Sequence, residues 1–416
     1  MSGRLVAVLL AAFALTGCGA GSAEPREAVF GQPPAVSMER TEKRGMAWHF
    51  CGWGQEDPAA DLSTLRQGAS WTYNWSNQPM ACEGGVADQL VGVPGAPDLE
   101  FVPMVWGLVD DGAACDAGGP CFRVDERQGG VSCGEPCGRD DLGPFAPGQA
   151  CYDCYHESVT RDAFVEGVPS SARYLLGYNE PNFKEQASLT PQAAAAAWRH
   201  VEGVADELGL GLVGPALNFC DPTPGAHHPG ACIEAVDGHA MLGFAWLEMF
   251  YDECTAEGAA GYDCRMEHQA AHVYSCWGIG WYLDMFRKKS GDMESEPHCY
   301  DGVLSGDEFG VDCGGNACMA CNEATRERFR RPLWLTEFAP AREDCGRTEE
   351  AWLEQRAAEF AASEIPLLED DPLVFRYAWF MPRAGHGLEH GSLLDEPGRL
   401  TPVGEAYFAP ARVSGD

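Results

Sequence analysis

Two glutamates stand where acid–base chemistry on a glycosidic bond is feasible. Glu180 lies in the segment YNEPN at 178–182 and Glu337 in the segment WLTEF at 334–338, each directly after an apolar run that predicts a buried strand. Cleavage of a glycosidic bond needs one carboxylic acid to protonate the leaving oxygen and one carboxylate to attack the sugar or activate water. The pair therefore predicts a glycosidase. In a chain with 63 acidic residues, chance placement is the alternative for either segment alone.

The elements that position these glutamates must end at a common face. Apolar or aromatic runs recur eight times, and several are separated by segments with helical spacing, at 191–208 after a Thr190 cap, at 239–251 and at 349–368. This alternation predicts a parallel sheet. Eight strands favour an α/β fold, the closed (β/α)8 TIM barrel, whose strand carboxyl ends converge on one mouth. The predicted strands are 44–50, 70–75, 99–106, 173–178, 211–218, 271–276, 332–338 and 374–380.

Two cysteine-rich insertions account for the length beyond a minimal barrel. They lie at about 110–160 and 288–327. If each leaves the carboxyl end of its preceding strand, both lie on the catalytic face and shape the cleft. In the second, the acidic spacing at 305–312 suggests either a calcium loop or a disulfide knot. It departs from the twelve-residue EF-hand pattern, so we favour the knot.

The first residues have the pattern of an export signal. A short positive start at 1–4 precedes an apolar stretch at 5–15 that is too short to span a bilayer, and LTGC follows at 15–18. This resembles the lipobox of bacterial lipoproteins, which implies cleavage before Cys18 and lipid on that cysteine. An ordinary secretory signal with an incidental cysteine is the alternative. Both predict an exported protein; the lipobox predicts one in the bacterial cell envelope or on its surface.

The resulting organisation has three parts. Residues 1–17 are the expected signal peptide, and residues 18–42, rich in Ala, Gly, Pro and Glu, are the expected flexible tether between lipid and domain. Residues 43–412 are the expected hydrolase domain. Membrane contact is then expected only through the lipid anchor.

The cysteine count agrees with export. There are 19 cysteines, and lipid on Cys18 leaves an even 18, enough for up to nine disulfides in an oxidising compartment. The pairs Cys151/Cys154 and Cys318/Cys321 have the C-x-x-C spacing that in a cytosolic chain suggests zinc or redox chemistry. Export favours disulfides instead. The spacing leaves their connectivity open.

Composition limits the partners. The chain has 28 basic against 63 acidic residues, a formal charge of −35, which disfavours nucleic acid and anionic surfaces as partners. A neutral polysaccharide is compatible with this charge. No Gly-rich phosphate loop, Ser/His/Asp elbow or nucleotide fingerprint is present in the sequence. We expect a monomer without an organic cofactor or catalytic metal.

The strand motifs together resemble glycoside hydrolase family 128, in clan A, in which the two glutamates follow the fourth and seventh strands. The likeness covers most of 43–411 outside the insertions, which depart from the family's shorter loops. It implies retaining hydrolysis of β-1,3-glucan, with endo action expected, Glu337 as the nucleophile and Glu180 as the general acid and then base. The motifs are RGMAW at 44–48, WTYNW at 71–75, FVPMVW at 101–106, LGYNEPN at 176–182, GPA at 214–216, HVY at 272–274, LWLTEF at 333–338, YAWF at 377–380 and LTPVGEAY at 400–407.

The mechanism places opposite demands on the two glutamates. Glu180 must remain protonated near neutral pH, whereas Glu337 must remain ionised through hydrogen bonds to its carboxylate. Retention also requires the two carboxyl groups about 5–5.5 Å apart, against roughly 6.5–9.5 Å for inversion. The resemblance places Asn179 on the sugar 2-hydroxyl. Tyr274 could hold the nucleophile, and His272 could line the same wall or simply fill the barrel.

Aromatic side chains are the candidates for stacking on sugar rings. The resemblance implies that Trp379, at the end of the eighth strand, is the platform beneath the sugar at the cleavage point. Trp48, Trp75 and Trp106 end three earlier strands, where they are either further sugar platforms or barrel plugs. Asn74 is either a sugar-hydroxyl partner or a turn-forming residue.

Two other functions are compatible with the same fold. One is hydrolysis of another β-linked polysaccharide, such as a β-1,4-mannan, xylan or galactan, by a clan A enzyme. The other is a non-catalytic surface lipoprotein that binds glycan. The presence of both Glu180 and Glu337 argues against it, because binding alone needs no paired acid and nucleophile.

Overall fold

The computed structural model describes residues 38–49, 56–80, 87–109, 121–125, 156–184, 186–219, 232–233, 243–306, 308–383 and 388–410. The signal peptide and most of the tether lie outside these residues. No helix in these ranges is both long and apolar enough to cross a membrane.

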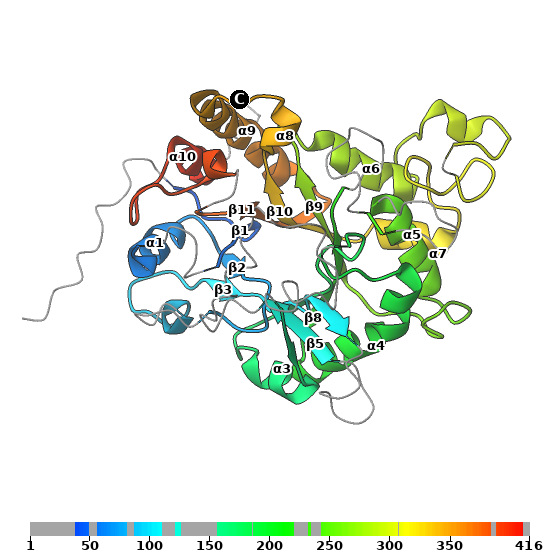
Figure 1. The fold of residues 1–416 in the computed structure, drawn as a ribbon, viewed down its shortest axis with the longest axis horizontal. Helices are drawn as coiled ribbons and strands as arrows, with labels where there is room; N and C mark the ends of the chain where they lie inside the picture. The colour runs from blue at the N-terminus through cyan, green and yellow to red at the C-terminus, as the bar shows by residue number, and fades with distance from the viewer. Residues whose placement is uncertain are drawn as a thin grey trace, which may run out of the picture.

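A parallel sheet of eight strands forms the centre of the fold (Figure 1). The strand order is β3-β2-β1-β11-β10-β9-β8-β7, which follows the chain around a ring. The ring closes where Leu176 accepts a hydrogen bond from the backbone N–H of Val105 and donates one to the carbonyl of Pro103, both at 2.9 Å. The predicted (β/α)8 architecture is confirmed. The strands are β1 (Arg44–Ala47), β2 (Trp71–Tyr73), β3 (Glu100–Phe101), β7 (Tyr174–Leu176), β8 (Gly211–Leu217), β9 (His268–Tyr274), β10 (Leu333–Ala339) and β11 (Val374–Phe380).

Helices surround this sheet on the outside (Figure 1). Two of the predicted helices match within two residues at each end, because their signals are local. The hydroxyl of Thr190 accepts a hydrogen bond from the N–H of Ala193 at the start of α4, and Gly209, with φ +68°, caps its carboxyl end. The helices are α1 (Pro58–Leu65), α3 (Arg161–Gly167), α4 (Pro191–Leu208), α5 (Gly243–Glu253), α6 (Gly280–Ser290), α7 (Glu323–Phe329), α8 (Arg342–Cys345), α9 (Glu350–Asp370) and α10 (Pro402–Phe408), with 3-10 turns η1 (Ala87–Gln89), η4 (Pro297–Tyr300) and η5 (Glu389–Gly391).

The interior of the barrel is closed by an arginine held between aromatic rings. Arg376 of β11 lies 4.8 Å from the ring centre of Trp334 and 5.0 Å from that of Tyr174. It also forms an ion pair of 2.8 Å with Glu100 of β3. Cation–π contacts and a paired charge offset the cost of burying the guanidinium. The two glutamates lie toward the opposite, carboxyl ends of the strands.

The first insertion begins at the predicted place, after the carboxyl end of the third barrel strand. Its described part is an antiparallel sheet of β4 (Gly107–Val109), β5 (Cys121–Asp125) and β6 (His156–Val159). Cys121 is disulfide-bonded. The pair Cys151/Cys154 lies outside the described residues.

The second insertion lies within its predicted bounds but does not leave from the carboxyl end of a strand. It begins after α6 rather than at the end of β9, because the helix follows its strand directly and the extra residues come only before α7. In Figure 1 this segment, yellow near residue 300, lies at the outer edge beside α6 and α7. The buried amine of Lys289 fixes its base by an ion pair to Glu248 of α5 and by hydrogen bonds to the carbonyls of Gly315 and Cys318.

Disulfides cross-link this insertion, as the favoured knot interpretation predicts. Cys299 pairs with Cys318, and Cys313 pairs with Cys321. The C-x-x-C pair Cys318/Cys321 is thus split between two bridges. Two further bridges, Cys254–Cys264 and Cys276–Cys345, lie elsewhere in the domain.

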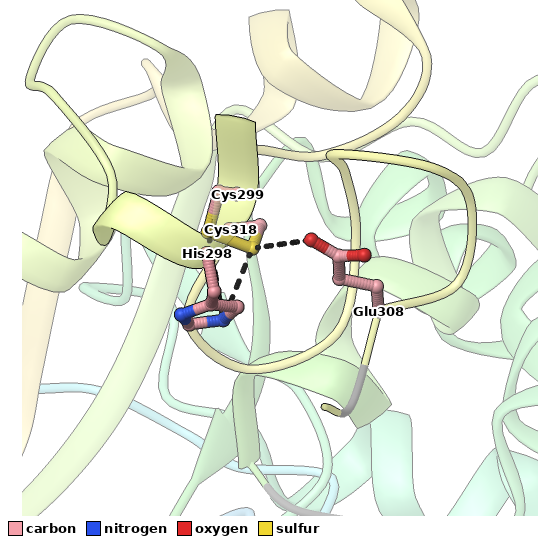
Figure 2. A group of neighbouring side chains, drawn as sticks. All are labelled: His298, Cys299, Glu308 and Cys318. Atoms are coloured by element: carbon pink, nitrogen blue, oxygen red, sulfur yellow. Dashed lines mark hydrogen bonds between the residues drawn. A yellow bond between two sulfur atoms is a disulfide. The ribbon is translucent and has the colours of Figure 1, made fainter. Parts of the chain in front are cut away.

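The side chains His298 and Glu308 lie beside the Cys299–Cys318 bridge (Figure 2). The His298 Nε2 atom is 3.6 Å from the sulfur of Cys318, and a Glu308 carboxylate oxygen is 3.5 Å from the same sulfur. This group contains the donor types of a zinc site, but sulfurs bonded to each other are not thiolate ligands. The cluster therefore belongs to the disulfide knot.

Candidate active site

Glu180 and Glu337 both lie at the carboxyl ends of barrel strands. Glu337 is the fifth residue of β10, and Glu180 follows β7 by four residues. The strands β9 and β8 lie between β10 and β7 in the ring. Both residues are almost fully buried: 4% of the surface of Glu337 and 6% of that of Glu180 is exposed. The two glutamates therefore meet at one mouth.

Three hydrogen-bond donors converge on the carboxylate of Glu337. The indole N–H of Trp75 donates to Oε1 at 2.7 Å, and the Tyr73 hydroxyl lies 3.0 Å from the same oxygen. The Tyr274 hydroxyl donates to Oε2. Donors on both oxygens favour the ionised form and fix the carboxylate in one orientation. A nucleophile needs both properties.

Within the described residues, the hydrogen bonds to Glu180 go to one of its two oxygens. The amide of Asn218 donates to Oε1 at 3.0 Å, and Nδ1 of His272 lies 2.6 Å from the same atom. Asn218 directly follows β8, and His272 is on β9. With Oε1 occupied by these two partners, Oε2 is the oxygen that can carry and deliver a proton.

His272 links the two carboxyl groups. Its Nδ1 atom is also 3.5 Å from Oε2 of Glu337, and one oxygen of each glutamate lies within 4.8 Å of the other. Its Nε2 atom is buried without a partner in the described structure. A proton on Nδ1, donated to Glu180, leaves Nε2 as an unpaired acceptor, which is less costly than an unpaired buried donor.

The pKa values follow from burial and from these close charges. Burial raises the pKa of Glu337, and the charge of Glu180 adds to this effect, while His272, Tyr274 and Trp75 oppose it. Burial lowers the pKa of His272, but the two carboxylates outweigh it, so the net direction is upward. Burial and the Glu337 charge raise the pKa of the Tyr274 hydroxyl well above its usual range, so it remains a donor.

Backbone strain coincides with the site. Glu180 has φ +41° and Trp75 has φ +62°, in the left-handed region that is unfavourable for side chains with a Cβ atom. Such conformations cost on the order of 1–3 kcal/mol each and persist only where the surroundings enforce them. The strained backbone thus occurs at the residue that carries one carboxyl group, Glu180, and at the residue whose indole N–H donates to the other, Trp75.

The prediction that Trp379 is the sugar platform is wrong. Trp379 is fully buried, packs 5.2 Å from the ring centre of Phe338, and donates its indole N–H to the carbonyl of Gly391. It pairs in register with Phe338, so both point outward while Glu337 points inward. Phe380, the next residue, has the opposite orientation. Its partly exposed ring lies 5.7 Å from Trp75 and 5.5 Å from Tyr274.

The other aromatic candidates are also buried. Trp48 is fully buried and Trp106 is 3% exposed, as expected of residues that fill a barrel. Trp75 is 6% exposed, and its indole N–H holds Glu337. The amide of Asn74 donates to the carbonyl of Gln78, a turn-forming contact.

Asn179 lies beside the acid, as its motif requires. It is 3% exposed, its amide donates to Gln186 at 3.0 Å, and its Oδ1 atom is buried without a partner in the described ranges. The backbone N–H of Asn179 donates to the carbonyl of Trp106 across the closure of the barrel. The side chain is therefore fixed next to Glu180 with one unused polar atom.

Three contacts of the site were not predicted from sequence: Tyr73, Asn218 and Phe380. The strand WTYNW at 71–75 contains the signal for the first, because residues two apart on a strand share a face and Trp75 was already a candidate. Asn218 directly follows its strand, and Glu180 also lies beyond the carboxyl end of its strand. Phe380 and Trp379 are neighbours on one strand and point to opposite faces of the sheet. Which of them faces the barrel interior depends on the register of β11 with β10.

The comparisons with known proteins identify the class. The family described as glycosyl hydrolase catalytic core matches residues 45–117, 153–295 and 316–407, and the chain belongs to this family. The two breaks in the match fall within the two insertions. No curated protein matched the chain.

Solved structures that are similar to this chain belong to glycoside hydrolase family 128. A subgroup II endo-β-1,3-glucanase from Sorangium cellulosum is 28% identical over 89% of this chain and 100% of its own, with a TM-score of 0.51. A second, from Pseudomonas viridiflava, is 26% identical over 89% and 99%, with a TM-score of 0.49. A subgroup I enzyme from Amycolatopsis mediterranei in complex with laminaritriose is 19% identical over 88% and 98%, with a TM-score of 0.46. The protein is thus a glycoside hydrolase.

The substitution Trp75→Phe tests the cradle of Glu337. It removes a donor to the carboxylate but keeps an aromatic ring, so the pKa of Glu337, already raised by burial, rises further. Because a glutamate nucleophile must be ionised, the acid limb of the kcat/KM profile moves to higher pH. We expect the wild-type limb to lie above about 4.3, the value of an exposed glutamate.

Activity against pH on one substrate measures this shift. The control is Trp277→Phe, an exposed indole that donates to the carbonyl of Asp344 and not to a carboxylate. An acid limb that stays in place or moves to lower pH in Trp75→Phe contradicts the proposed role of the indole N–H.

Proposed function

We propose that this protein hydrolyses β-1,3-glucan by double displacement. The observation that carries the proposal is the closeness of the two carboxyl groups, with one oxygen of each within 4.8 Å of the other and His272 between them. This spacing supports retention, because it is shorter than the roughly 6.5–9.5 Å that separates the two carboxyl groups of inverting enzymes. The relative from Sorangium cellulosum, an endo-β-1,3-glucanase, supports the substrate and endo action.

In the first step Glu337 attacks the anomeric carbon while Glu180 transfers its proton to the leaving oxygen. The Glu337 oxygen that does not bond to carbon keeps its hydrogen bonds from Tyr274 or from Trp75 and Tyr73. The leaving chain departs with the proton. A covalent glycosyl-enzyme ester remains.

In the second step Glu180, now a carboxylate, removes a proton from water, and that water attacks the anomeric carbon. His272 and Asn218 stabilise the negative charge that Glu180 carries between the two steps. Glu337 leaves as the carboxylate on which its three donors converge. The same hydrogen bonds thus serve both half-reactions.

Two further residues are proposed to bind the sugar at the cleavage point. Phe380 takes the role expected for Trp379, because its partly exposed ring lies against Trp75 and Tyr274. Asn179 is proposed to bind the 2-hydroxyl beside the acid, where its Oδ1 atom has no partner in the described structure. Neither role needs a cofactor.

The substitutions Glu337→Ala and Glu180→Ala test the assignment on a linear β-1,3-glucan. We expect the release of reducing ends to fall by at least about 10²–10⁴-fold in each, as for the loss of a catalytic acid or base. Glu180→Ala should retain more activity on a substrate with an activated leaving group, which needs no proton, whereas Glu337→Ala should not. The sizes of the products distinguish endo from exo action.

The control for both is Glu359→Ala, which truncates a half-exposed glutamate of α9 outside the site. Wild-type protein that is folded and inactive on β-1,3-glucan contradicts the proposed substrate. Activity on mannan, xylan or galactan then identifies another specificity, and glycan binding without cleavage identifies a binding lipoprotein.

We also propose that the protein is exported and carries lipid on Cys18. The support is the sequence alone, since this segment lies outside the described residues. In a bacterial host fed a labelled fatty acid, the wild-type chain should incorporate label and partition with membranes, whereas Cys18→Ala should do neither. Label that persists in Cys18→Ala contradicts the site.

A further inference from the structure

We propose that Phe219 and Trp281 form the binding subsite for the leaving-group sugar. This inference rests on the proposed function and adds where the sugar on the leaving-group side of the cleaved bond binds. Three observations carry it: the exposure of the two rings, their attachment to the acid Glu180 rather than to the nucleophile, and their fixed mutual geometry.

Exposure sets these two rings apart from most aromatic residues of the domain. Phe219 is 41% exposed and Trp281 is 45% exposed, although large aromatic side chains are normally buried in a fold with this much core. An exposed aromatic pair next to a catalytic site is a surface kept open for a ligand. Five aromatic residues in the described ranges are this exposed: Phe219, Trp277, Trp281, Tyr300 and Phe309.

The other exposed aromatics have different settings. Tyr300 and Phe309 belong to the second insertion, which leaves from α6 and not from a strand end. Trp277 has the guanidinium of Arg356 at 5.6 Å from its ring centre and donates its indole N–H to Asp344. One face of Trp277 is thus in use. Among the exposed aromatic residues of the described ranges, this leaves Phe219 and Trp281 as the pair attached to the elements next to Glu180.

The two residues come from the barrel elements next to the acid. Phe219 directly follows Asn218, whose amide donates to Glu180 at 3.0 Å. Trp281 is in the first turn of α6, which follows β9 and His272. The two partners of the Glu180 Oε1 atom, Asn218 and His272, therefore belong to the same two barrel units as Phe219 and Trp281.

The nucleophile has its own aromatic residues on the other side. Trp75 and Tyr73 come from β2 and its end, Phe380 from β11, and all three lie near Glu337 through hydrogen bonds or ring contacts. In double displacement the nucleophile faces the sugar that stays, and the acid faces the sugar that leaves. The rings beside Glu180 therefore lie where the leaving sugar must pass.

The geometry of the pair is fixed and apolar. The ring centres are 5.6 Å apart at an interplanar angle of 88°, an edge-to-face contact that holds both rings. The indole N–H of Trp281 donates to the carbonyl of Gly278 at 3.0 Å, so the polar edge is satisfied and an apolar surface is left for a ligand. The flat face of a neutral pyranose ring has complementary shape and polarity.

The test compares two substrates that differ only beyond the cleaved bond. Laminarihexaose, a β-1,3-linked hexamer of glucose, places sugars on both sides of the site. β-Laminaribiosyl fluoride has a single atom as its leaving group and cannot occupy the proposed subsite. Measuring kcat/KM on both separates leaving-group binding from the chemistry at Glu337.

We expect Trp281→Ala combined with Phe219→Ala to lose about tenfold more activity on laminarihexaose than on the fluoride. Trp281→Phe, which keeps a flat ring, should lie between wild type and the double variant. Phe309→Ala, equally exposed in the second insertion, is the matched control and should lower neither value. Thermal unfolding of each variant shows whether the domain remains folded.

The outcomes separate the subsite from the proposed function. If wild type cleaves both substrates and the double variant loses the same factor on each, or none on laminarihexaose, the subsite proposal is overturned while the proposed function stands. If folded wild type fails on laminarihexaose, the proposed function itself is overturned. Should the double variant unfold, Trp281→Phe against Phe309→Ala decides by the same ratio.

Discussion

The site depends on one array of hydrogen bonds, in which Glu180, His272 and Glu337 share a small buried volume. Two carboxyl groups within 4.8 Å of each other in a buried environment repel, and burial alone already raises the pKa of Glu337. The imidazole between them and the donors around them make the arrangement possible. The chemistry uses the same features: Glu180 carries first a proton and then a negative charge, Glu337 attacks and later leaves as a carboxylate, and fixed donors hold both groups throughout.

The barrel explains how this array is maintained. Each described partner of the two glutamates lies on a strand or within two residues of its end, and the strands β7, β8, β9 and β10 are hydrogen-bonded neighbours. Short-range order in the sheet therefore positions the acid against the nucleophile. The surrounding sheet and its aromatic core offset the conformational free-energy cost of the strained backbone at Glu180 and Trp75.

Much of this could be predicted from sequence, because its signals are local or periodic. The eight apolar runs predicted the barrel, the Thr190 cap predicted the start of α4, and the glutamates at strand ends predicted the carboxyl pair. What failed depended on long-range register. Trp379 and Phe380 are adjacent aromatics, and only the pairing of Phe338 with Trp379 decides which of them faces the mouth. The second insertion lies within its expected bounds of about 288–327, but α6 stands between it and β9, so the expectation that it leaves the carboxyl end of a strand failed.

The most direct test of the central claim is the anomeric configuration of the first product released from a β-1,3-linked oligosaccharide, followed by proton NMR before mutarotation. The closeness of Glu180 and Glu337 predicts that the β anomer appears first and the α anomer only later, as the new reducing end equilibrates. An α anomer that appears first would mean direct displacement by water, which contradicts the covalent role of Glu337 and the spacing on which the mechanism depends.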